Sequence, residues 1–158
     1  MGKKGVSRYA PTKGLWTCGT VELYNESMGS LLAVDLGLKT GLALYGPDGR
    51  LCWYRSKNYG PTAALKRGAY TLLNSIPDLS FLVMEGGGTV AAIWEREAIR
   101  RSIPVQQINA EKWRQKLLYP REQHTGLQAK HYADDLARRT ITWSGISRPS
   151  SLRHDTAE

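Results

Sequence analysis

The sequence contains few of the residues that build several common classes of protein. It has two cysteines, Cys18 and Cys52, and three histidines, His124, His131 and His154, which together form no zinc signature. We therefore expect neither a disulfide framework nor a structural zinc site. No run of 18 or more apolar residues is present, so we expect no segment that spans a membrane. The basic first residues lack the apolar core of a secretory signal. We expect an intracellular protein, cytoplasmic if its source is bacterial or a phage, and organellar if its source is eukaryotic.

Acidic residues are the minority among the charges. The chain has 14 Asp and Glu against 22 Lys and Arg, a net charge of +8. This excess suits a polyanionic partner, nucleic acid first and an anionic membrane surface second. A length of 158 residues predicts one domain with a sizeable core. We expect residues 1–30 to form a basic, partly flexible extension and residues 31–158 to form the domain.

The order of apolar runs and turn residues predicts a mixed α/β fold. Strands are predicted at 31–36, 40–45, 51–55, 80–85 and 104–108, and helices at 61–76, 89–102, 109–117 and 127–139, followed by a loop at 140–152 and a final acidic helix. Three strands in hairpin order, followed by alternating strands and helices, give a five-stranded mixed sheet. Its first three strands are antiparallel, the later ones are parallel, and helices cover both faces.

Two of the predicted strands end in an acid. Asp35 follows the apolar run 31–34, and Glu85 follows the apolar run 81–84. If the first and fourth strands are adjacent and parallel, their carboxylates lie side by side at one edge of the sheet. Because like charges repel strongly in a partly buried place, such a pair persists mainly where a divalent cation neutralises it. The alternative is that each acid simply ends its strand in a solvated loop.

A second pair of acids closes the sequence. Asp155 and Glu158 are three residues apart, which places them on one face of a helix. With Asp35 and Glu85, they could hold two Mg²⁺ ions, with Mn²⁺ as a substitute, because hard cations prefer oxygen ligands. Two such ions can activate a water and stabilise the leaving oxygen of a phosphodiester. The alternative is that Asp155 and Glu158 are ordinary acids in the first turn of a helix.

These motifs, in this order, resemble those of the RNase H-like nucleases, and most of all the RuvC-type Holliday junction resolvases. The shared features are the Asp-x-Gly-x-x-x-Gly turn that begins at Asp35, the Glu at the end of the fourth strand and the late Asp-x-x-Glu. The resemblance covers residues 31–158. It implies an RNase H-like fold and a Mg²⁺-dependent endonuclease that cleaves branched DNA, such as a four-way junction, by a two-metal mechanism. It also implies that Asp35, Glu85, Asp155 and Glu158 are the catalytic metal ligands, with His154 as an alternative ligand.

The resemblance also implies a partner surface and a dimer. Lys39, Arg114 and Lys130 are our candidates for nucleic-acid contacts, with Trp113 and Tyr119 interleaved among the basic residues for base stacking. Symmetric cleavage of a junction needs two active sites and therefore a homodimer. We expect the dimer surface on the 89–102 helix, where Ile93, Trp94 and Ala98 exceed one inward stripe.

The chain departs from the resolvases at two places. The resolvases often carry a large wedge side chain shortly after the Glu of the fourth strand, whereas this chain has Gly87, Gly88 and Thr89. Trp94 could replace the wedge, or it could belong to the core. The acidic helix is cut short at Glu158, so we expect the natural protein to continue.

Two alternative functions follow from the same residues. An RNA-processing nuclease of the YqgF type fits the turn after Asp35 equally well, although Glu85 argues against it because that group usually lacks this acid. A non-catalytic module that binds branched nucleic acid fits the short acidic helix and the missing wedge. A sugar-kinase-like ATPase would need a second domain, for which 158 residues leave no room.

Overall fold

The computed structural model describes residues 29–37, 39–122 and 125–147. In chain order, the elements are β1 (Ser30–Asp35), β2 (Thr40–Tyr45), β3 (Leu51–Lys57), α1 (Thr62–Asn74), β4 (Leu79–Glu85), α2 (Gly88–Ile99), β5 (Val105–Ile108), α3 (Ala110–Leu117), the 3₁₀ turn η1 (Pro120–Glu122) and α4 (Gly126–Ser144). Their order is the predicted one. No helix within these ranges is long and apolar enough to cross a membrane. Residues 1–28 of the predicted extension 1–30 and the predicted acidic helix at the end of the chain lie outside the described residues.

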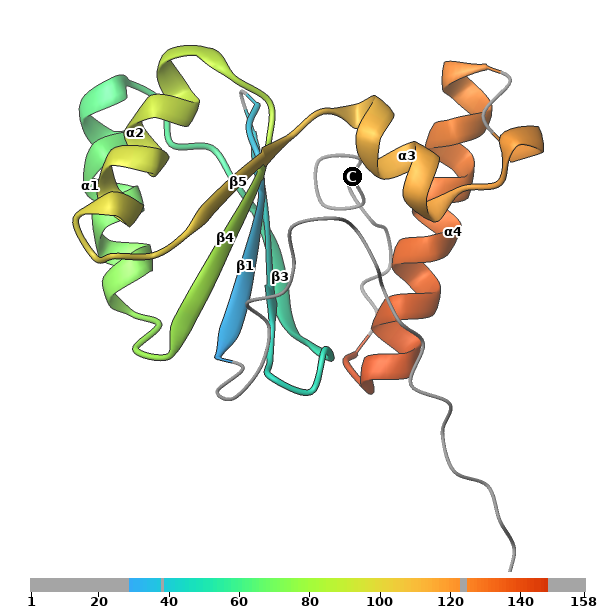
Figure 1. The fold of residues 1–158 in the computed structure, drawn as a ribbon, viewed down its shortest axis with the longest axis horizontal. Helices are drawn as coiled ribbons and strands as arrows, with labels where there is room; N and C mark the ends of the chain where they lie inside the picture. The colour runs from blue at the N-terminus through green and yellow to red at the C-terminus, as the bar shows by residue number, and fades with distance from the viewer. Residues whose placement is uncertain (1–28, 38, 123–124, 148–158) are drawn as a thin grey trace, which may run out of the picture.

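The strands form one five-stranded sheet in the order β3-β2-β1-β4-β5. β1 pairs antiparallel with β2, and β2 pairs antiparallel with β3, whereas β4 lies parallel to both β1 and β5. Helices α1 and α2 cover one face of the sheet, and α3 and α4 lie on the other side (Figure 1). The predicted mixed sheet with helices on both faces is therefore confirmed.

The apolar core lies between the sheet and the α1–α2 layer. Alternate residues of the two central strands, Leu32 and Val34 on β1 and Leu82 and Met84 on β4, are buried in this core. Trp94 of α2 is completely buried beside them. The opposite face of β1 is only half-buried, although residues 31–34 are all apolar. The core therefore lies on one face of the sheet, and the opposite face of β1 is not part of it.

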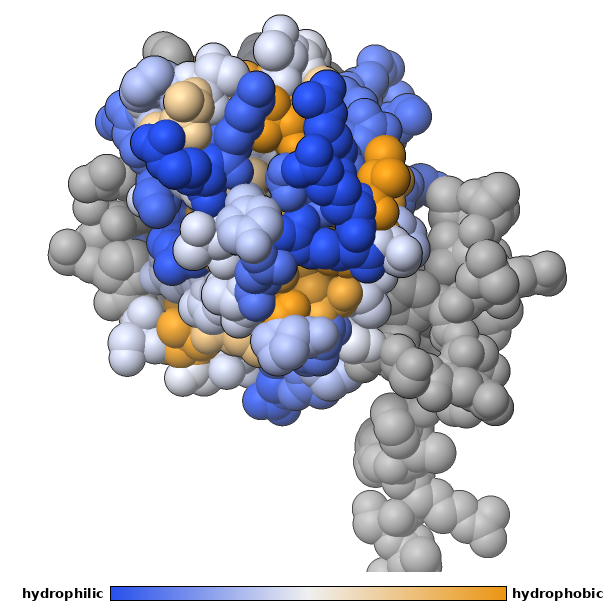
Figure 2. All heavy atoms as spheres, turned by 90° about the vertical axis from the view of Figure 1, so that its left-hand side faces the viewer, coloured by the Kyte–Doolittle hydropathy of each residue, from blue (hydrophilic) through white to orange (hydrophobic). Residues whose placement is uncertain are grey.

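Helix α2 corrects two predictions about its surface. Ile93, Trp94 and Ala98 are all buried, so these side chains cannot form the predicted dimer surface, and Trp94 is a core residue rather than a wedge. Ile99 is 65% exposed, because it is turned about 100° around the helix from Ala98. The face over α1 and α2 is mainly hydrophilic, with scattered apolar side chains (Figure 2). The homodimer itself stays a prediction.

Helix α4 is longer than the sequence indicated. The Ser, Gly and Pro residues of 140–152 predicted a loop there, yet the helix continues to Ser144. Ile141 is buried, and the hydroxyls of Thr140 and Thr142 donate to carbonyls one turn back, at 3.0 and 2.8 Å. The packing of Ile141 therefore outweighs the weak helix propensity of the segment. The helix ends at Gly145, whose φ of 75° suits glycine.

Candidate active site

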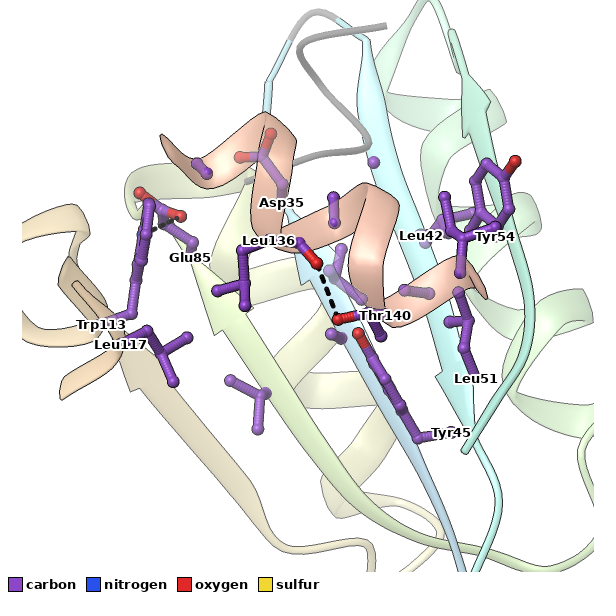
Figure 3. Close-up of a pocket in the computed structure, with 18 of the residues that line it drawn as sticks. Asp35, Leu42, Tyr45, Leu51, Tyr54, Glu85, Trp113, Leu117, Leu136 and Thr140 are labelled. Atoms are coloured by element: carbon purple, nitrogen blue, oxygen red, sulfur yellow. Dashed lines mark hydrogen bonds between the residues drawn. The ribbon is translucent and has the colours of Figure 1, made fainter. Parts of the chain in front are cut away.

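Asp35 and Glu85 stand directly opposite each other in the parallel ladder of β1 and β4. Each is the last residue of its strand. The backbone N–H of Leu36 donates to the carbonyl oxygen of Glu85 at 2.9 Å, which extends the ladder one residue past Asp35. Both acids are half-buried and line the side of the sheet that faces α4 (Figure 3). The adjacency of the first and fourth strands, on which the predicted pairing depended, is present in the structure.

A glycine turn lets the chain leave the sheet directly after Glu85. Gly86 has a φ of +107°, and a Cβ at this position would lie 3.0 Å from Cβ of Leu36. A larger residue would therefore be strained and would press against the end of β1. Gln107 of β5 donates through Nε2 to the carbonyl oxygen of Gly86. This turn holds the ends of β1, β4 and β5 together around the two acids.

A cleft of about 560 Å³ lies between the sheet and α4, with Asp35 and Glu85 in its lining. The sheet contributes small side chains to it, among them Ala33 and Ala43, and α4 contributes others, among them Ala137. Because these side chains are small, they leave part of the space between helix and sheet unfilled. Tyr45 also lines the cleft, and burial raises the pKa of its phenol above the usual 10.0. Tyr45 is therefore neutral at physiological pH and does not act there as a base.

A second hollow, of about 520 Å³, opens at the end of β5. Asp35 and Glu85 line this hollow as well, together with Asn109 and Lys112. Asn109 caps α3 by accepting from the backbone N–H of Lys112 at 2.9 Å. Lys112 is exposed and belongs to this hollow, so it is a candidate for a phosphate contact that the sequence did not single out among the basic residues.

Trp113 makes a direct contact with one of the two acids. Its indole Nε1–H donates to Oε2 of Glu85 at 2.9 Å (Figure 3). The sequence suggested base stacking for this residue and missed the hydrogen bond. One signal was present: Trp113 lies five residues after Ile108, which ends β5, and Ile108 is the strand partner of Glu85. A helix that begins at Ala110 therefore starts beside the acid.

The chemistry of the two acids fits a hard divalent cation. Two carboxylates on adjacent parallel strands supply oxygen ligands from one place, as Mg²⁺ and Mn²⁺ prefer. Within the described part of the chain, no group of three or more Asp, Glu, His or Cys side chains could hold a metal ion. Asp155, Glu158 and His154 lie outside the described residues, so their roles as ligands stay predictions.

The three predicted nucleic-acid contacts lie on different elements. Lys39 is exposed and directly precedes β2, close along the chain to Asp35. Arg114 of α3 is half-buried, and its guanidinium carbon lies 5.3 Å from the centre of the Trp113 ring. Lys130 is exposed on the first part of α4. Their contacts with nucleic acid stay predictions.

Comparison with known proteins identifies the fold. No family model matches the sequence, and no curated protein sequence matches it. The crystal structure of the fowlpox virus resolvase in complex with its substrate Holliday junction DNA is similar, with a TM-score of 0.50 and 13% identity over 75% of this chain and 78% of that chain. The yeast mitochondrial Holliday junction resolvase Ydc2 is similar with a TM-score of 0.50 and 11% identity, over 82% of this chain and 75% of that chain. The chain therefore has the RNase H-like fold of these resolvases.

Proposed function

We propose that this protein is a Mg²⁺-dependent endonuclease that cleaves phosphodiester bonds in branched DNA, as in the resolution of a Holliday junction. The observation that carries the proposal is the pairing of Asp35 with Glu85 at the ends of adjacent parallel strands. The two half-buried carboxylates repel each other, and yet the fold holds both in the lining of a cleft. This arrangement suits a metal site better than a structural role.

Each group of residues has a part in this activity. Asp35 and Glu85 would hold the metal, with Asp155 and Glu158 as the proposed further ligands. Two bound Mg²⁺ ions would supply an activated water and stabilise the leaving oxygen of the phosphodiester. Lys112, which lines the hollow beside the acids, would hold a phosphate of the substrate there.

The choice of branched DNA as substrate rests on the fold and on charge. The two similar structures described above are of Holliday junction resolvases, and one of them is a complex with Holliday junction DNA. The net charge of +8 suits a long polyanion. A junction has two equivalent strands to cut, so we also propose that the active form is a homodimer with one site in each copy.

The test is a cleavage assay with three labelled substrates: a four-way junction, a plain duplex and an RNA–DNA hybrid, each with and without Mg²⁺. We expect cuts in the junction only with Mg²⁺. Glu85→Gln should abolish cutting and leave junction binding in EDTA unchanged, because it weakens the metal site and leaves the basic surface intact. Asp48→Asn is the matched control, since Asp48 lies in the exposed turn between β2 and β3.

The outcomes separate the three functions that the sequence left open. Failure to cut any of the substrates would overturn the proposal. Cleavage of structured RNA without cleavage of the junction would favour the RNA-processing alternative. Tight junction binding that is unchanged in Asp35→Asn, without metal-dependent cutting, would favour the binding module.

A further inference from the structure

The indole of Trp113 uses its single polar atom on the acid at the centre of the candidate site. Nε1–H is the one hydrogen-bond donor of a tryptophan side chain, and here it lies 2.9 Å from Oε2 of Glu85. The ring is half-buried and lines the same cleft as the acid. Figure 3 shows the indole edge turned toward the carboxylate. A hydrogen bond to a charged acceptor is stronger than one between neutral groups, so this contact fixes the direction of the Glu85 carboxyl group.

The contact also connects two elements that differ in how firmly they are held. Glu85 ends the central strand β4, whereas α3 has no buried residue. Helix α3 begins at the cap Asn109 and reaches Trp113 after one turn. The hydrogen bond therefore links a lightly packed helix to the rigid edge of the sheet.

The same helix carries the charges that a nucleic acid would meet. Lys112, Arg114 and Lys116 lie on α3, against the single acid Glu111 in its first turn. The guanidinium of Arg114 lies over the ring of Trp113, with its carbon 5.3 Å from the ring centre. The indole of Trp113 thus lies between Glu85, which would bind the cation, and Arg114, one of the basic side chains of α3 that would bind phosphates.

We propose that Trp113 is a positioning residue: its indole N–H orients the Glu85 carboxylate for a divalent cation and ties the basic helix α3 to it. This inference rests on the proposed function. Orientation by an outer partner is how metal-binding carboxylates are commonly held in place. The cation would bind Glu85 and the nucleic acid would bind helix α3, and one hydrogen bond joins the two. Binding of the cation therefore strengthens binding of the nucleic acid, and the reverse holds to the same extent.

The first test compares two Trp→Phe variants. Trp113→Phe keeps an aromatic ring and removes the donor. Trp53→Phe is the matched control, because Trp53 also carries a stacked Arg, with Arg55 at 4.4 Å, but lies on β3, at the far side of the sheet from β4. Isothermal titration with Mg²⁺ should show affinity weakened by about 10–100-fold in Trp113→Phe and unchanged in Trp53→Phe.

A second test observes the hydrogen bond without changing the tryptophan. The indole N–H of Trp113 gives one cross-peak in a ¹⁵N–¹H spectrum, assigned by its loss in Trp113→Phe. We expect this peak to move on addition of Mg²⁺ and in Glu85→Gln, while the peak of Trp53 stays in place. A Trp113 peak that stays unmoved in Glu85→Gln would overturn the inference, even if Trp113→Phe proved unstable.

The third test measures the coupling. Anisotropy of a labelled four-way junction gives its affinity with EDTA and with Ca²⁺, which replaces Mg²⁺ so that the junction stays intact, as a gel would verify. The ratio of the two affinities should fall toward one in Trp113→Phe and persist in Trp53→Phe. A ratio and a Mg²⁺ affinity equal to those of the parent protein would refute the role of Trp113 while the proposed nuclease stands. If the parent protein itself bound no Mg²⁺, both the proposed function and this inference would fail.

Discussion

Replacing Asp35 by Asn should stabilise the protein when no divalent cation is present. The substitution keeps the shape of the side chain and removes one of two like charges that face each other across β1 and β4. Neighbouring strands lie about 4.8 Å apart. Two unit charges separated by about 4–7 Å repel by roughly 2–4 kcal/mol at an effective dielectric constant near 20.

The measured gain should be smaller than this repulsion. Water in the cleft screens the charges, and Trp113 already stabilises the charge of Glu85 by its hydrogen bond. We expect Asp35→Asn to raise the free energy of unfolding by about 2 kcal/mol, the lower end of that range. For a chain of this length the midpoint of thermal unfolding should rise by about 4–8 °C, at roughly 2–4 °C per kcal/mol.

Addition of Mg²⁺ should reverse the order of stability. At about 100 times its dissociation constant, a cation that binds only the folded state adds about 2.7 kcal/mol. The parent protein should gain this amount, and Asp35→Asn should gain little of it. Calorimetry of the parent protein and of Asp35→Asn, each with EDTA and with Mg²⁺, gives the four free energies of unfolding. Asp48→Asn, in an exposed turn, serves as control. A variant that is less stable than the parent in EDTA and equally stabilised by Mg²⁺ would refute the paired-acid site.

Three shorter predictions concern binding and packing. Raising the salt concentration from about 50 to 200 mM should weaken junction binding by about 10³–10⁵-fold if 6–10 phosphates are contacted; a flat response in a binding titration would speak against the basic surface. Lys130→Ala should lower the slope of that salt dependence by about one. Leu82→Ala should lower the free energy of unfolding by about 2–5 kcal/mol in urea, because Leu82 is fully buried. Leu127→Ala, at a residue 81% exposed, should stay within about 0.5 kcal/mol, and an equal loss in both variants would contradict the assigned core.

The sequence predicted the sheet and the place of Asp35 and Glu85 because both depend on local signals. Each acid follows an apolar run of strand length, and the hairpin turn at Gly46–Gly49 fixes the antiparallel pair of β2 and β3. The crossover from β3 through α1 then returns the chain to the far side of β1. The strand ends were therefore predicted from the sequence, whereas the adjacency of β1 and β4, which the sequence left as a condition, comes from the structure.

The surface of α2 and the length of α4 needed the tertiary structure. Both faces of α2 carry apolar side chains, so periodicity alone did not distinguish buried Trp94 from exposed Ile99. On α4, the burial of Ile141 and the hydrogen bond from Leu51 N–H to Ser144 Oγ, at 2.9 Å, extend the helix through a segment of low propensity. Contacts distant in sequence decided both, and no local pattern records them.

The contact between Trp113 and Glu85 was not predicted from the sequence. It joins residues 28 apart in the sequence and requires both the register of β4 with β5 and the direction in which α3 leaves Asn109. A basic segment with interleaved aromatics is typical of stacking on bases, so the composition favoured a surface role. The structure uses the polar edge of the indole instead, and the one signal for it in the sequence was the position of Trp113, five residues after the end of β5.

The division of the sheet into two faces explains why stability and site chemistry can be changed separately. Along β1, Leu32 and Val34 are buried in the α1–α2 core, whereas Ala33 and Asp35 line the cleft on the α4 side. Strand residues alternate between faces, so each position contributes to one side only. The core can therefore hold the strand ends in register while the acids stay exposed to a cation. Asp35→Asn should then leave the packing of Leu32 intact.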